Sequence, residues 1–103
     1  MRALVLTMLL ASPALAAPDT RAFLRYCEAR TPAATCGCIA SEVARTRNGQ
    51  IALDAYGVTQ APAAQQRAAA LALANKYGAR ASEIEAAISA TEPALRSATE
   101  RCL

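Results

Sequence analysis

Four cysteines constrain the fold of this chain more than any other feature of its sequence. They stand at Cys27, Cys36, Cys38 and Cys102, with eight, one and sixty-three residues between successive positions. An even number of cysteines in a small exported chain is typical of a disulfide framework. We therefore interpret them as two structural disulfides that both start from the Cys36-Gly37-Cys38 stretch.

The first sixteen residues predict the compartment in which such bonds form. A short positive start (Met1-Arg2) precedes an apolar run over residues 3–11, and small residues at 14 and 16 suit a signal peptidase. We predict a cleaved signal peptide over 1–16 and a single mature domain over 17–103, periplasmic or secreted. The apolar run is shorter than the ~20 residues of a membrane-spanning helix, so we expect no stable membrane insertion after cleavage.

The composition predicts a thin core and a surface of mixed charge. The chain has no Trp, one Phe and three Tyr, and it is rich in Ala, which favours helix but buries little apolar area. Positive and negative residues alternate, and no aromatic residues are interleaved with basic ones, so we expect no nucleic-acid binding. The absence of His excludes imidazole ligands and His-dependent triads, and we expect no metal and no cofactor.

The apolar periodicity and the helix-ending signals predict an all-α fold, a small bundle of four to five short helices. The expected helices cover residues 20–30, a second segment ending at 47, 50–56, 62–77 and a last segment from 82 onward. Asn48-Gly49, Gly57 and Gly78 are interpreted as the ends of three of them, because glycine adopts the left-handed cap conformation readily.

The last segment carries the most sustained apolar stripe of the chain. Its positions are four, three, four, three and four residues apart: Ile84, Ile88, Thr91, Leu95, Ala98 and Cys102. Such spacing predicts one helix, or two nearly collinear helices, that pack in a single seam. Ser82 with Glu85 is interpreted as a capping box at its start, and Pro93 predicts a kink or a restart near Glu92.

The positions of the cysteines on the helices suggest how they pair. Cys36 belongs to the apolar stripe of the second helix, whereas Cys38 diverges from it by about 200° and needs a different partner. We predict Cys36–Cys102, which joins the two stripes, together with Cys27–Cys38. The alternative is Cys27–Cys36 with Cys38–Cys102, which a later start of the second helix would favour. The third pairing, which includes Cys36–Cys38, is the least favoured because that bridge is strained in a helix.

We expect a non-enzymatic protein-binding role, such as inhibitor, immunity protein or envelope chaperone. The partner would be another envelope protein, and the chain itself a monomer or weak dimer. Tyr56, Val58 and Tyr77 are the candidate contact residues, because tyrosines are common anchors at interfaces. In general arrangement the chain is similar to small bacterial envelope proteins such as acid-stress chaperones and immunity proteins, a likeness of class that carries over no residue.

The alternative function is a thiol–disulfide oxidoreductase that acts through Cys36-Gly37-Cys38. Two thiols near a helix N-terminus can have a lowered pKa and form a strained, oxidising disulfide. The chain lacks the Cys-x-x-Cys spacing and the strand–helix alternation of thioredoxin-like proteins.

Overall fold

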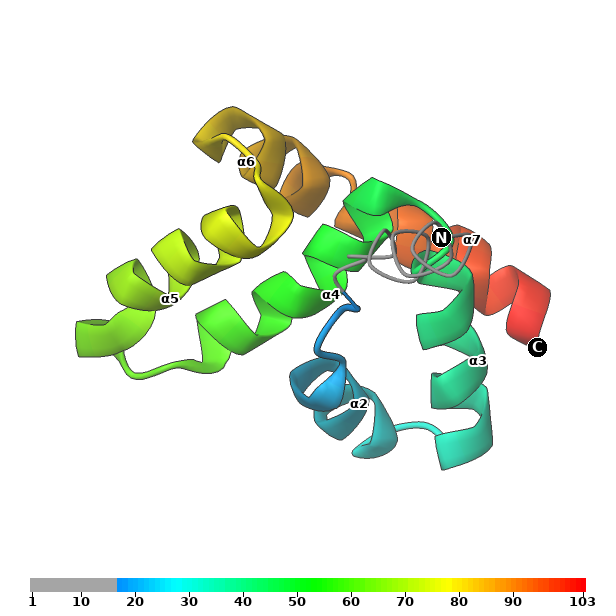
Figure 1. Cartoon of the computed structure of the whole chain (residues 1–103). Coiled ribbons are helices and arrows are strands. Elements are labelled where there is room, and N and C mark those ends of the chain that lie inside the picture. Colours follow the sequence, from blue (N-terminus) through cyan, green and yellow to red (C-terminus); the bar gives the residue numbers. More distant parts are fainter. Residues whose placement is uncertain (1–16) are drawn as a thin grey trace, which may run out of the picture.

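The computed structural model describes residues 17–103, which form an all-α fold (Figure 1). This region contains six helices: α2 (Arg21–Glu28), α3 (Ala33–Val43), α4 (Arg47–Gln60), α5 (Ala63–Tyr77), α6 (Ala81–Ser89) and α7 (Thr91–Cys102). The all-α prediction is confirmed, although the expected four to five helices become six. The predicted signal peptide lies outside the described residues. None of the described helices combines the length and the hydropathy needed to cross a membrane.

Helix α4 is the central element, and it separates two small apolar cores. It packs against α2 and α3 on one side and against α5 and α6 on the other, as Figure 1 shows. Ile51 and Ala55 lie one turn apart and belong to the core shared with α5 and α6. Leu53, about 200° around the helix from Ile51, belongs to the core shared with α2, α3 and α7. A helix that buries apolar residues on two faces holds both cores in register.

Two of the three glycine positions were interpreted wrongly. Gly78 does end α5 in the left-handed conformation, with φ of 58°. Gly49, however, lies in the first turn of α4, where its N–H donates to the Thr46 hydroxyl over 3.0 Å. A Cβ at Gly49 would overlap the backbone carbonyl of Val43. The close approach of the Val43 backbone to Gly49 therefore requires glycine at this position. Gly57 lies inside α4, which continues to Gln60.

The last segment folds as two helices with different neighbours. The expected capping box is absent, since α6 starts at Ala81 without a side-chain cap. The helix is interrupted at Ala90, and Pro93 stands in the first turn of α7, where its missing N–H breaks no helical hydrogen bond. The predicted restart is therefore confirmed. The predicted single seam is wrong, because α6 packs mainly on α4 and α7 mainly on α3, which leaves Ile88 48% exposed.

Candidate binding groove

The disulfides join Cys27 to Cys36 and Cys38 to Cys102, with Cα–Cα separations of 5.9 Å in each. The preferred prediction was therefore wrong, and the alternative pairing is present. The reason lies in which helix covers the buried stripe of α3. Helix α2 packs on that stripe beside Cys36, which is fully buried, so the nearby Cys27 reaches it. Cys38 lies roughly opposite and meets the end of α7.

The start of α3 does not explain the pairing. A later helix start, near Cys36, would favour this pairing, but α3 begins at Ala33 with Pro32 as its N-cap. The prediction that Cys36 and Cys38 serve different partners is confirmed. Because these two cysteines are not bonded to each other, the redox pair of the alternative function is not formed in this structure.

A groove of about 270 Å³ lies beside the buried disulfide. Its lining comes from three helices and the residues next to them: Phe23, Tyr26, Cys27, Arg30, Thr31, Thr35, Ile39, Leu95, Thr99 and Leu103. Most of these are apolar, and Phe23, Cys27 and Ile39 are buried. We call this site the α2–α7 groove.

The α2–α7 groove is built from stripes of residues at helical spacing. Residues 23, 26, 27 and 30 form one wall on α2 and the turn after it, and residues 95, 99 and 103 form the other wall along α7. Thr35 and Ile39, one turn apart on α3, lie between them, since α3 packs against both α2 and α7. Each wall is fastened to α3 by one disulfide. Cys36-Gly37-Cys38 therefore fixes the width of the groove.

A positive charge lies at the rim of the α2–α7 groove. The Arg30 guanidinium lies over the Tyr26 ring, 4.4 Å from its centroid, and Nη1 donates to the Tyr26 carbonyl over 3.2 Å. Within residues 17–103, no carboxylate pairs with it. Tyr26 is 48% exposed and Leu103 is 87% exposed, on opposite walls. The site thus offers apolar surface and one oriented cation.

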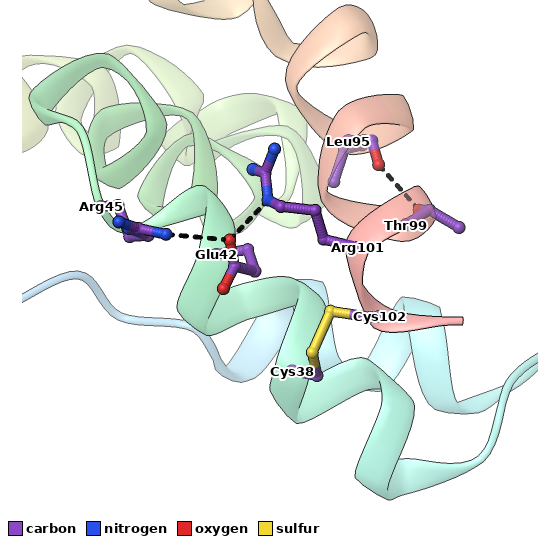
Figure 2. Close-up of a disulfide and its surroundings, with 7 residues drawn as sticks. All are labelled: Cys38, Glu42, Arg45, Leu95, Thr99, Arg101 and Cys102. Carbon is purple, nitrogen blue, oxygen red and sulfur yellow. Dashed lines mark hydrogen bonds and ion pairs between the residues drawn. A yellow bond between two sulfur atoms is a disulfide. The ribbon is translucent and has the colours of Figure 1, made fainter.

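The α7 wall is held to α3 by a covalent and an ionic contact (Figure 2). The Cys38–Cys102 bond is flanked by Arg101, whose Nε donates to Glu42 Oε1 over 2.6 Å. The hydrogen bond from Arg101, helped by Arg45, holds the pKa of Glu42 below its ordinary value. One turn before Cys102 in α7, Ala98 is fully buried against the core.

Acid is expected to destabilise the fold below about pH 4.5, because Glu42 and Glu83 have lowered pKa values next to Arg101 and Arg47. A carboxylate whose pKa is lower in the folded than in the unfolded state stabilises the fold at pH values above its unfolded pKa. This stabilisation is lost as the pH falls through the folded-state pKa. With no His, the melting temperature should change little between about pH 6 and about pH 8.

Thermal melts recorded from about pH 8 to below about pH 4.5 test the acid prediction. Glu42→Gln should flatten part of the acid decline, whereas Glu85→Gln, at a carboxylate without an ion pair in the described region, should not. An acid decline that is identical in wild type and Glu42→Gln would contradict the assignment.

The predicted contact residues lie elsewhere. Tyr77 is 7% exposed and its hydroxyl donates to Asp54 Oδ2 over 2.8 Å, so it is a core residue. Burial, followed by that hydrogen bond, raises its pKa. Val58 is half-buried against the second core. Tyr56 lies behind the α2 wall, with its ring centroid 5.3 Å from that of Phe23 and 5.8 Å from that of Tyr26.

Sequence reasoning missed Tyr26, Arg30 and Leu103. The stripe that holds the first two was visible, since Phe23, Tyr26, Cys27 and Arg30 recur at spacings of three, one and three residues. That they form a groove wall depends on where α7 lies. Leu103 carries no periodic signal that separates it from a solvent-exposed residue.

A larger hollow of about 510 Å³ lies between the start of α4 and the α6–α7 junction, but it offers weaker chemistry. Its apolar lining is four alanines: Ala52, Ala87, Ala90 and Ala94. Its one cationic side chain, Arg47, already pairs with Glu83 over 2.7 Å. Aromatic and branched side chains give more contact area than alanine, so the α2–α7 groove is the better candidate.

In residues 17–103, no group of three or more Cys, Asp or Glu side chains could hold a metal ion. No protein family, curated protein or solved structure matches this chain, so the site stands on its own geometry.

Proposed function

We propose that this chain is a non-enzymatic binding protein of the periplasm or extracellular space, and that the α2–α7 groove holds a segment of a protein partner. The observation that carries the proposal is the combination of an apolar groove with the guanidinium of Arg30 at its rim, which pairs with no carboxylate within residues 17–103. Inhibitor, immunity protein and envelope chaperone are the classes of binding protein that this role covers.

Charge complementarity defines the partner segment. Apolar side chains would lie against Ile39, Leu95 and Phe23, and a carboxylate would reach Arg30, which the Tyr26 ring already orients. Such preorganisation lowers the entropy lost on binding. An apolar segment with one acidic residue beside its anchor is therefore the expected partner, contributed by another envelope protein.

The architecture also supports binding over catalysis. Each disulfide fastens one groove wall to α3, as expected for bonds that shape a surface. The oxidoreductase alternative requires Cys36 and Cys38 to exchange as a pair, whereas Cys36 is fully buried and bonded to Cys27.

Site-specific photo-crosslinking tests the proposal. A photoreactive amino acid replaces either Leu103 in the groove or Leu71 on α5, which is 61% exposed and distant in the sequence from the groove-lining residues. The mature chain is then incubated with an envelope extract. We expect crosslinks from position 103 to map to an apolar segment that carries a carboxylate, and none of that identity from position 71.

Charge reversal provides the matched control. Arg30→Glu should reduce the crosslink yield at position 103 by roughly tenfold, the effect of losing about 1.4 kcal/mol. Arg67→Glu, an exposed cation on α5, should leave it unchanged. Equal yields from the two positions, or equal effects of the two reversals, would contradict a groove-specific partner.

A further inference from the structure

We infer that the Cys38–Cys102 disulfide is a redox latch on the α2–α7 groove: a dithiol reductant opens it selectively and releases the α7 wall, while Cys27–Cys36 stays closed. The effect on partner binding rests on the proposed function. The selectivity of reduction and the release of the wall do not.

The two disulfides differ in how easily a thiolate can reach them. Cys36 is fully buried and Cys27 is 9% exposed, within the first core. Cys38 is exposed, and Cys102 is half-buried, with part of its surface packed against the first core. Exchange requires a thiolate to approach a disulfide sulfur, so access decides which bond opens first. The folded chain therefore presents one reducible bond.

The step is ordinary thiol–disulfide exchange. A thiolate of the dithiol attacks Sγ of Cys38, the Cys38–Cys102 bond breaks, and Sγ of Cys102 leaves as a thiolate that takes up a proton. The second thiol of the reductant then attacks the mixed disulfide, forms the cyclic disulfide of the reductant and releases Cys38. Two electrons pass from the dithiol to the protein.

Opening this bond removes the strongest restraint on the last turn of α7. Upstream, Leu95 and Ala98 pack on the first core and hold the start of the helix in place. Beyond them, the described contacts to α3 include the ion pair of Arg101 with Glu42, whose side chains are 50% and 24% exposed and which contributes little on its own. Leu103 is 87% exposed and adds almost no buried area. Without the disulfide, Thr99 and Leu103, two of the three residues in the α7 wall, can therefore move away from α3.

Timed alkylation of the oxidised mature chain tests the selectivity. The protein is treated with dilute dithiothreitol, quenched with iodoacetamide and analysed by mass spectrometry. We expect a species with two alkyl groups, at Cys38 and Cys102, to form at least tenfold faster than the species with four. Simultaneous loss of both disulfides, or earlier alkylation at Cys27 and Cys36, would overturn the latch.

Hydrogen exchange tests the release of the wall without reference to a partner. In the two-alkyl species, amides of residues 99–103 should exchange at least tenfold faster through local opening of the last turn, whereas those of α2 and the centre of α4 should remain protected and accelerate only with the fall in global stability. Cys38→Ser/Cys102→Ser should behave in the same way. Unchanged exchange over residues 99–103, or loss of protection in α2 and α4 to the same level as in residues 99–103, would overturn the inference.

The crosslink from position 103 then separates the latch from the proposed function. A yield that falls at least fivefold on selective reduction supports regulation of the groove. An equal yield in both forms overturns that regulation and leaves the binding role standing. Loss of groove specificity in the oxidised protein, with the exchange result intact, overturns the binding role and leaves the latch.

Discussion

Removal of the Cys38–Cys102 disulfide by Cys38→Ser/Cys102→Ser is expected to lower the free energy of unfolding by about 4 kcal/mol. The bond closes a loop with a sequence separation of 64, and the chain-entropy cost of opening grows with loop length. Cys27–Cys36, with a separation of 9, is expected to contribute about 3 kcal/mol by the same estimate. Urea denaturation of Cys38→Ser/Cys102→Ser and of Cys27→Ser/Cys36→Ser, each with its remaining disulfide formed, measures the two losses of stability.

The two loops do not overlap along the chain, so their contributions should add. Loss of both would cost about 7 kcal/mol, which is comparable to the whole stability of a small domain. The chain without any disulfide should therefore be unfolded at room temperature. A fully reduced chain that retains a cooperative urea transition would show that the helices suffice without the disulfides.

Gly49→Ala is the second large effect, with an expected loss of about 3 kcal/mol. The added methyl group meets the Val43 carbonyl, which is backbone and cannot rotate away as a side chain could. The start of α4 must then shift away from the end of α3, although Thr46 caps that turn. Urea denaturation measures the loss.

Gly37 and Gly57 provide matched controls within the same chain. Both are helical, and a Cβ at either meets nothing within 4 Å. Gly57→Ala and Gly37→Ala should each raise stability by about 0.5 to 1 kcal/mol, because glycine is unfavourable in a helix interior. If Gly49→Ala also proved stabilising, the close approach of α3 and α4 would be wrong.

Local signals predicted most helices well. Gly78 ends α5, which matches the helix predicted over 62–77, and the apolar stripe of Cys36, Ile39, Ala40 and Val43 is buried in α3. The predictions that failed depended on which segments of the chain pack against each other. Gly49 resembles a helix end in sequence, yet it is needed because another segment of backbone lies against it. No local pattern encodes that contact.

The disulfide pairing failed for a related reason. The stripe of the last segment suggested a continuous seam ending at Cys102, but the chain turns between α6 and α7 and carries the stripe onto two different helices. The groove depends on the same arrangement, since its walls come from α2 and α7. The divergence of Cys36 and Cys38 was local geometry, and it was predicted correctly.

Helix α3 fastens one groove wall on each side through Cys36 and Cys38, and cysteine mapping tests this most directly. Both cysteines lie on the tryptic peptide 31–45, so one alkylating reagent is applied after partial reduction and a second after full reduction, and fragmentation spectra locate each label. We predict that Cys38 shares its label with Cys102, and Cys36 with Cys27. A shared label on Cys36 and Cys102 would contradict it.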